Sequence, residues 1–300
     1  MSAQSRSLTV GVIGAGRVGA ILGAALAAAG HHVVAASGVS AAAKHRIATL
    51  LPQARNLPAD QVAREAHDLL IIAVPDDALA AVVAGLAGIG ALHPGQVVVH
   101  TSGAHGLGVL EPARAVGARP LALHPAMTFT GTPADLARLE DGVSFGVTAP
   151  PELAVIAHDL VDDLQGQLEW IDEQDRPLYH AALAHGANHL VTLVNEAADR
   201  LRDAGVTHPE KVLGPLLRAA LENALASGDA ALTGPVSRGD AGTVAKHVAA
   251  LGTVAPDSVP AYLALARRTA DRAIAVGRLR PTDAEPLLGV LAGKPETVHS

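Results

Sequence analysis

Residues 8–19 read Leu-Thr-Val-Gly-Val-Ile-Gly-Ala-Gly-Arg-Val-Gly, which places Gly14, Gly16 and Gly19 at the spacing G-x-G-x-x-G. The apolar run 10–13 precedes these glycines and predicts a buried strand. A small-residue helix is predicted from residue 17 to about residue 29, and a second apolar run follows at 32–36. This order predicts a strand–turn–helix–strand unit, the local structure in which the glycine pattern binds a dinucleotide.

Each glycine has its own physical role in such a unit. Gly14 permits the tight turn, Gly16 lets a pyrophosphate approach the backbone, and Gly19 lets the helix pack closely on the sheet. Free N–H groups and the helix dipole then favour the anion. The residues predicted to bind the cofactor are Gly14, Ala15, Gly16, Arg17, Val18, Gly19 and Ser37, joined by Val74, Pro75 and Asp76 after a later strand.

The composition of the 300 residues restricts the class of protein. Hydrophobic residues make up 49% and charged residues 17%, which indicates a globular chain with a large core. The net charge of −7, without a basic tract, argues against nucleic acid as a partner. The absence of cysteine excludes disulfides, thiolate zinc sites and cysteine nucleophiles. With no 18-residue apolar window and no apolar signal core at the start, we expect no membrane span and a cytoplasmic protein.

Strands and helices alternate in the first part of the chain. Further strands are predicted at 53–57, 68–74, 96–100, 120–124, 142–147 and 167–171, with helices at 78–92 and 151–164. Such alternation predicts an α/β fold with a parallel, doubly wound sheet. After residue 172 only helices are predicted, at 176–203, 209–226, 243–251, 259–276 and 282–291. We therefore predict a dinucleotide-binding domain over residues 1–172 and a helical substrate and dimerisation domain over residues 173–300.

The end of the second strand bears on the type of nicotinamide cofactor. NAD-binding proteins usually place a carboxylate there for the ribose hydroxyls, and residues 34–40 contain none. Ser37 and Ser40 could donate to a 2′-phosphate, which Lys44 or Arg46 could neutralise. NADP(H) is therefore the preferred prediction and NAD(H) the second. In the alternative interpretation, Lys44 and Arg46 lie on a solvated helix face and bind nothing.

Two of the fifteen histidines are the last residues of predicted strands. His100 and His124 each end a strand, and ligands bind at the carboxyl ends of the strands in open parallel sheets. Imidazole can donate a proton or a hydrogen bond near neutral pH, so both histidines are candidate catalytic residues, with Ser102 beside the substrate. The alternative is that each histidine hydrogen-bonds its own loop.

Two polar groups interrupt the helical half. One helix carries His180, His185, Asn188 and His189; His185 and His189 share a face, but no H-E-x-x-H pattern supports a metal, and none is predicted. The loop 234–240 holds Ser237, Arg238 and Asp240, where a guanidinium could bind a substrate carboxylate. Alternatively, Asp240 caps the next helix and pairs with Arg238.

Taken together, these motifs resemble a bacterial family of Rossmann-like proteins with a DUF2520 domain, described as NADP oxidoreductases, from about residue 8 to about residue 275. The motifs are the glycine loop, Val74-Pro75-Asp76-Asp77, His100-x-Ser102-Gly103, His124-Pro125, the helix with His180 and Asn188, and Gly234-Pro235-Val236-x-Arg238-Gly239-Asp240. The resemblance extends to pyrroline-5-carboxylate reductase, ketopantoate reductase and 6-phosphogluconate dehydrogenase. It implies a helical domain that forms a homodimer and a substrate cleft between the two domains.

Two positions depart from these relatives. Ala184 stands four residues before Asn188, where relatives that act on alcohols often carry a lysine, so a histidine would have to handle the proton. Gly38 stands where related proteins often have an arginine, which weakens the preference for NADP(H).

The sequence therefore predicts an NADPH-dependent reductase of a small carboxylated carbonyl compound similar to ketopantoate. His180, His124 or His100, in that order, would donate the proton, while Asn188 would hold the oxygen. Arg238, with Ser237, Asp240 and Ser102, would bind the rest of the substrate. A cyclic-imine reductase is the near alternative, since a protonated imine needs no strong acid. The missing lysine also leaves open a non-catalytic NADP-binding sensor, and a metal-dependent hydrolase comes third.

Overall fold

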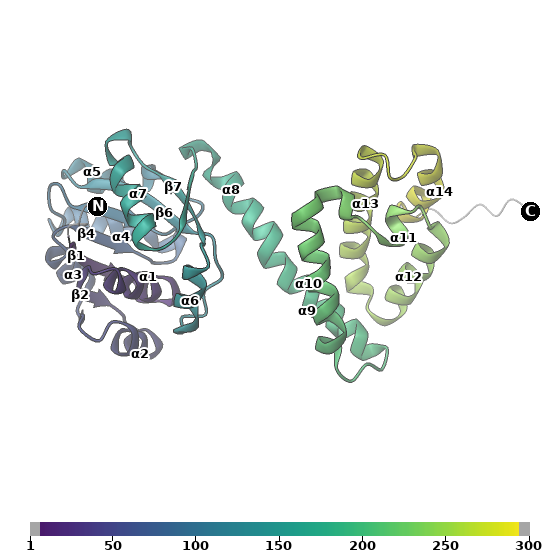
Figure 1. Ribbon diagram of the computed structural model, residues 1–300, viewed down its shortest axis with the longest axis horizontal. Helices are drawn as coiled ribbons and strands as arrows, with labels where there is room; N and C mark the ends of the chain where they lie inside the picture. Colours follow the sequence, from purple (N-terminus) through teal and green to yellow (C-terminus); the bar gives the residue numbers. More distant parts are fainter. Residues whose placement is uncertain (1–6, 294–300) are drawn as a thin grey trace, which may run out of the picture. The chain divides into compact units, whose positions relative to one another are not determined.

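The computed structural model describes residues 7–293. Contacts between residues divide the chain into two compact units that meet at Gly186 and Ala187. The first unit holds an α/β sheet and the second is helical (Figure 1).

An eight-stranded sheet forms the centre of the first unit, in the order β3-β2-β1-β4-β5-β6-β7-β8. The strands are β1 Thr9–Ile13, β2 His32–Ser37, β3 Arg55–Asn56, β4 Leu69–Ile72, β5 Val97–His100, β6 Arg119–Pro125, β7 Ser144–Thr148 and β8 Gln167–Trp170. The order turns outward from β1 in both directions, so the sheet has the topological switch point at which doubly wound folds bind dinucleotides. The predicted fold class is confirmed.

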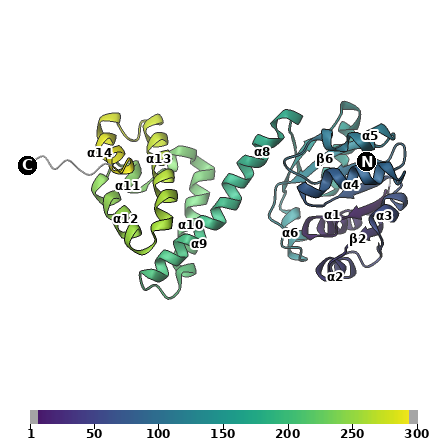
Figure 2. The ribbon, with the colours of Figure 1, turned by 180° about the vertical axis from the view of Figure 1, so that it is seen from behind.

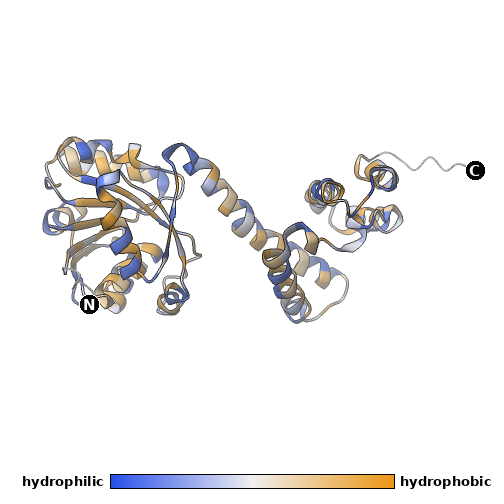
Figure 3. Ribbon diagram, turned by 45° about the horizontal axis from the view of Figure 1, so that its top comes forward, coloured by the Kyte–Doolittle hydropathy of each residue, from blue (hydrophilic) through white to orange (hydrophobic). Residues whose placement is uncertain are grey.

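Helices cover both faces of this sheet (Figures 1 and 2). The helices of the first unit are α1 Arg17–Ala28, α2 Ala41–Leu50, α3 Ala59–Glu65, α4 Asp76–Gly88, α5 Glu111–Ala115, α6 Ala134–Glu140, α7 Ala154–Asp163 and α8 Arg176–Leu183. One buried cluster joins the sheet to α1 and α7, and another joins it to α3 and α4. The central strands β1, β4 and β5 are mostly apolar and buried, because both faces of the sheet are covered there, and the middle of the sheet is largely orange in Figure 3. The edge strands β3 and β8, by contrast, are more polar and largely exposed. Each fully buried Leu, Ile or Val contributes about 1.5–3 kcal/mol.

One strand pair departs from the predicted parallel arrangement. β6 and β7 pair antiparallel, with His124 opposite Gly146, while β7 and β8 pair parallel to each other. The last two strands therefore run against the first six. This arrangement brings β7 beside the carboxyl end of β6, where the sequence places His124.

The second unit contains helices only among its described residues. They are α9 His189–Asp203, α10 Pro209–Ser227, α11 Gly234–Ser237, α12 Ala241–Val254, α13 Val259–Ala275 and α14 Pro281–Leu291. Its buried cluster is small and rich in alanine, with Ala266, Ala270 and Ala273 from α13 facing Leu287 of α14. The helix predicted at 176–203 is continuous but widens into one π turn at Ala184–Asn188. No helix within residues 7–293 is both long and apolar enough to cross a membrane.

Candidate functional site

The three glycines of the first turn differ in the space around them. Gly14 has φ +87°, and a Cβ there would lie 2.5 Å from the carbonyl oxygen of Ala73. A Cβ at Gly19 would lie 2.3 Å from the Gly14 oxygen, so only glycine lets α1 pack this closely. At Gly16, by contrast, the nearest atom would be 3.9 Å away. Gly14 and Gly19 therefore maintain the turn, whereas Gly16 leaves open space beside it.

The backbone of this turn offers unused hydrogen-bond donors. The Ala15 N–H donates to the Ser37 carbonyl of β2 at 2.8 Å, so it is not available to a ligand. The N–H groups of Gly16, Arg17 and Val18 have no acceptor within the part of the chain that the structure describes. Three unpaired donors at the positive end of α1 form the kind of site that binds a phosphate.

The segment after β2 is held by its own hydrogen bonds. The Asn56 side chain accepts from the Gly38 N–H at 3.2 Å, and Ser40 caps α2 by accepting from the Ala43 N–H at 3.1 Å. A Cβ at Gly38 would lie 2.9 Å from Ile47, so an arginine does not fit there without rearrangement. Lys44 is exposed, whereas Arg46 is half-buried.

The loop after β4 lies beside the turn. Val74 contacts Gly14, since a Cβ on that glycine would lie 3.1 Å from the valine side chain. Pro75 occupies the N-cap position of α4, and Asp76 lies in the first turn of that helix, where the helix dipole stabilises its carboxylate. The negative charge of Asp76 also acts on the imidazoles of His100 and His124, where it offsets a small part of the lowering of their pKa values by burial.

His100 is fully buried at the end of β5, and its own loop occupies both ring nitrogens. Nε2 donates to the Gly106 carbonyl at 2.8 Å, while Nδ1 accepts from the Ser102 N–H at 3.2 Å. Burial lowers the pKa of His100 to about 4. The ring is therefore neutral and has no free nitrogen for a substrate, which favours the alternative that His100 holds its loop.

Ser102 is also occupied by this loop. Its hydroxyl oxygen accepts from the N–H groups of Ala104 and His105, both at 3.2 Å. The Glu173 carboxylate caps the following 3₁₀ turn by accepting from Leu107 and Gly108. The loop after β5 is therefore fixed at both ends by hydrogen bonds.

His124, Tyr179 and His180 come together at the end of β6. The His124 Nδ1 lies 2.9 Å from the Tyr179 hydroxyl, and the ring centres of His124 and His180 are 6.1 Å apart. Gly103 provides the space for both histidines, because a Cβ there would lie 2.8 Å from His180 and 3.1 Å from the His124 Nε2. Gly146 makes room for Tyr179 in the same way, since its Cβ would lie 2.6 Å from the hydroxyl.

The surroundings keep His124 and Tyr179 neutral. Burial, together with the charges of His180 and Arg176, lowers the pKa of His124 to about 4. Burial raises the pKa of Tyr179 above its usual value. At neutral pH the contact between them is therefore a hydrogen bond between an uncharged imidazole and an uncharged phenol.

A buried cation that the sequence does not predict lies beside these residues. Arg176, the first residue of α8, is completely buried and donates to Thr148 Oγ1 at 2.8 Å. It also donates to the carbonyls of Ser102, Ala122 and Gly146 at 3.4, 3.3 and 3.0 Å. These oxygens belong to β6, β7 and the loop after β5, so one guanidinium joins the three segments around the His124 group. No local pattern distinguishes Arg176 from a surface arginine that begins a helix.

In the second unit, the loop 234–240 uses two of its predicted site residues for its own structure. Ser237 is buried and donates to the Gly234 carbonyl at 3.1 Å. Asp240 caps α12 by accepting from the Thr243 N–H and hydroxyl, which together with Arg238 lower its pKa. Arg238 and Asn188 are exposed. The capping alternative therefore describes Asp240, while the roles predicted for Arg238 and Asn188 stay predictions.

The same unit has a pocket of about 430 Å³ among α9, α11, α12 and α13. Its wall is mostly apolar, and Tyr262 and His247 contact each other there at 2.9 Å. Pro235 and Val236 line it, whereas Ser237, Arg238 and Asp240 do not. No three His, Asp or Glu side chains within residues 7–293 come together as metal ligands.

The sheet order and the glycine turn define a Rossmann-type unit followed by a helical unit. In particular, residues 2–125 match the Rossmann-like domain family, and residues 143–269 match DUF2520, a domain of unknown function. The chain therefore carries both a Rossmann-like domain and a DUF2520 domain, as the resemblance implies. A comparison with proteins of curated function finds no relative.

Several solved structures share the fold over most of the chain. A Bacteroides fragilis protein assigned as an NADP oxidoreductase is 21% identical with a TM-score of 0.74, covering 88% of this chain and 98% of its own. An imine reductase from Pseudomonas is 20% identical with a TM-score of 0.61, covering 91% and 99%. The Plasmodium falciparum pyrroline carboxylate reductase, solved with NADP bound, is 13% identical with a TM-score of 0.58, covering 93% and 98%. The chain thus shares its fold with these three proteins.

Proposed function

We propose that this protein is an NADPH-dependent reductase of a small carboxylated carbonyl compound. The single observation that carries the proposal is the open glycine turn, where the N–H groups of Gly16, Arg17 and Val18 are unpaired next to free space. These residues fit a pyrophosphate, and the reductases similar in fold include one solved with NADP. When bound, the cofactor supplies the hydride that reduces the substrate. NADP(H) is the proposed cofactor, with NAD(H) as the second.

The proposed substrate-binding groups are His124 and His180. The Tyr179 O–H donates to Nδ1 of His124, so the imidazole presents an Nε2–H beside Gly103. A neutral N–H can hold a carbonyl oxygen and stabilise the negative charge that develops there. Because the pKa of His124 is about 4, it is a hydrogen-bond donor rather than an acid at neutral pH. His180, which contacts it, is proposed as the proton source.

A cyclic-imine reductase is the second candidate. Two of the similar structures are named as a pyrroline carboxylate reductase and an imine reductase. In addition, Ala184 leaves the long helix without a lysine for proton transfer. The two candidates are separated by following NADPH oxidation with ketopantoate-like oxo acids and with cyclic imines. Oxidation with oxo acids alone supports the first candidate, and oxidation with imines alone supports the second.

We also propose a homodimer formed through the helical unit. Large apolar side chains are exposed along α9 and α10, which a monomer would leave in water. They are Leu190, Val191 and Leu193 on α9, and Val212, Leu216, Leu221 and Leu225 on α10. The exposed fraction reaches 80% at Leu225.

The decisive experiment for the cofactor compares Gly16→Ala with Gly85→Ala. The Gly16→Ala protein keeps its fold, because the added methyl meets nothing closer than 3.9 Å, but the methyl occupies the open space where the pyrophosphate would approach. We expect its affinity for NADPH to fall by about 100-fold in titration calorimetry, since close backbone hydrogen bonds to the phosphates are lost.

Gly85 lies in the middle of α4 with nothing within 4 Å of an added methyl. Its replacement by alanine is the matched control and should leave NADPH affinity unchanged. Unaltered binding by Gly16→Ala, or no binding by the unmodified protein, would refute the proposal.

A further inference from the structure

Two arginines from different helices converge on one glycine of the first unit. Arg17 is the first residue of α1, and Arg46 lies on α2. A Cβ at Gly131 would lie 2.6 Å from Nε of Arg46 and 2.8 Å from Cγ of Arg17. The backbone of Gly131, at φ +76°, therefore lies directly against both side chains.

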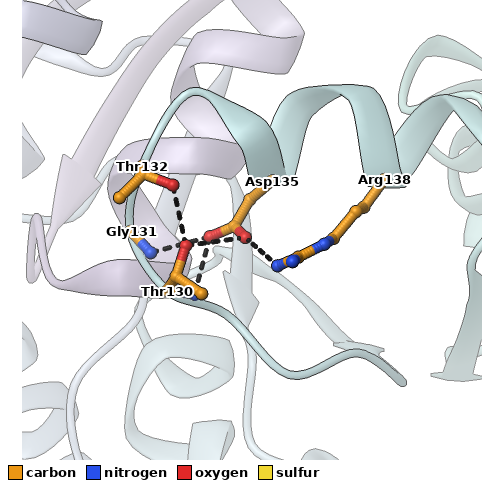
Figure 4. Close-up of polar contacts among 5 residues, drawn as sticks. All are labelled: Thr130, Gly131, Thr132, Asp135 and Arg138. Atoms are coloured by element: carbon orange, nitrogen blue, oxygen red, sulfur yellow. Dashed lines mark hydrogen bonds and ion pairs between the residues drawn. The ribbon is translucent and has the colours of Figure 1, made fainter. Parts of the chain in front are cut away.

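A buried carboxylate fixes the loop that carries this glycine (Figure 4). Asp135 is completely buried and accepts from the N–H groups of Thr130 and Gly131, both at 2.7 Å. It also accepts from the Thr130 hydroxyl and from Arg138, each at 2.9 Å. Burial alone would raise the pKa of Asp135, but these hydrogen bonds lower it below its usual value. The hydrogen bonds to Asp135 thus fix the position of Gly131.

The charges of this region are not balanced. Arg138 has Asp135 as its partner, but the guanidinium groups of Arg17 and Arg46 make no hydrogen bond or ion pair with any residue between 7 and 293. Arg17 is exposed and Arg46 half-buried, so both can reach a ligand. Two neighbouring cations repel each other unless an anion lies between them.

The position of the pair in the fold identifies the anion. Arg17 begins the helix that follows β1, and Arg46 belongs to the helix that follows β2. In this fold the adenosine ribose lies at the end of β2, while the pyrophosphate lies at the start of α1. The pyrophosphate has the N–H groups of residues 16–18, so a second phosphate beside the ribose is what remains for the arginines.

We propose that Arg17 and Arg46 together bind the 2′-phosphate of NADP(H), with the loop around Gly131 as the third wall of this site. The proposal rests on the proposed function, because it requires the dinucleotide in the glycine turn. It also explains how a chain with Gly38 after β2 can select the phosphorylated cofactor. In this chain the guanidinium groups come from α1 and α2 instead.

The experiment measures the affinities of NADPH and NADH by titration calorimetry for the unmodified protein, Arg46→Ala, Arg46→Gln and Arg17→Ala. We expect each arginine variant to weaken NADPH by about 10- to 100-fold, as for the loss of one charged hydrogen bond, and NADH by less than about twofold. Lys44→Ala is the comparison variant, because Lys44 is an exposed cation on the same helix and is the other residue that the sequence offers for this phosphate. The arginine variants should also bind 2′-AMP more weakly than the unmodified protein, whereas their affinity for 5′-AMP should not change.

Three outcomes would overturn the proposal. An equal loss of NADPH and NADH affinity in the arginine variants would assign these residues to the pyrophosphate. Unchanged affinities, or a loss of NADPH affinity only in Lys44→Ala, would exclude them from the site. In all of these cases the unmodified protein still binds a dinucleotide, so the proposed function stands. If the unmodified protein binds neither nucleotide, the proposed function fails and this inference fails with it.

Discussion

His100 shows how a residue can fit a functional pattern and still serve the fold. It stands at the carboxyl end of a strand, where sequence reasoning expects catalysis, yet Gly106 and Ser102 occupy both of its nitrogens. His124 stands at the equivalent place on the next strand and keeps Nε2 beside Gly103. The difference arises because the loop after β5 folds back over its own histidine, whereas Tyr179 reaches His124 from a distant helix.

The lowered pKa of His100 predicts a pH dependence of stability. The folded protein holds the ring neutral down to about pH 4, while the unfolded chain protonates it near pH 6.5. Stability contributed by His100 is therefore complete above pH 6.5 and is lost as the pH falls from 6.5 towards 4, by roughly 3 kcal/mol. Urea unfolding at a series of pH values gives the slope of the unfolding free energy against pH. In His100→Gln this slope should correspond to about one proton fewer taken up on unfolding.

His45→Gln is the control for this measurement, since His45 is exposed on α2. Its slope should match that of the unmodified protein. An unchanged slope in His100→Gln would contradict the assignment of a neutral buried ring.

At the scale of elements, the sequence was sufficient where the signal is local. The glycine turn, the apolar strands and the ends of α9 at Asp203 and α10 at Ser227 lie within a few residues of where the pattern predicts them. The contacts of Arg176, Asp135 and the Arg17–Arg46 pair were not predictable. Each depends on segments that are far apart in the sequence, and a single arginine or aspartate at a helix start has the same local pattern on a surface.

Helix α6 and the loop before it depend on Asp135. Replacing a fully buried carboxylate that accepts two backbone N–H groups leaves those donors unpaired. We expect Asp135→Ala to lower the free energy of unfolding by about 3–5 kcal/mol and to weaken NADPH binding through displacement of Gly131. Chemical denaturation and calorimetry measure the two effects.

Glu140→Gln removes an exposed carboxylate from the same helix and should change neither quantity by more than about 0.5 kcal/mol. A stable Asp135→Ala protein with ordinary NADPH affinity would show that the loop is held by other contacts.

At the scale of the whole molecule, the alternation of strands and helices made the α/β half predictable except for the direction of β7 and β8, which run against the other strands. Strand direction is set by the connection and the pairing of distant segments, and an apolar run carries no information about it. The helical half was predictable as helices, but the apolar residues exposed on α9 and α10 read in sequence like core residues.

These exposed residues predict the oligomeric state. If a second copy covers them, Leu216→Glu and Leu225→Glu should convert a dimer into a monomer, because each would bury an unpaired charge in the interface. Sedimentation velocity measures the change. Val155→Glu, at a position 71% exposed on α7 of the other unit, is the control and should not alter the mass. A monomeric unmodified protein would contradict the proposed homodimer.

The buried guanidinium of Arg176 has a practical consequence for dissecting the gene. Thr148 and the backbone oxygens of Ser102, Ala122 and Gly146 all receive their hydrogen bonds from a side chain encoded after the last strand. A truncated product that stops with β8 would lose the guanidinium that donates to these buried oxygens. An autonomous nucleotide-binding fragment therefore has to include Arg176, several codons past the point where its sheet is complete.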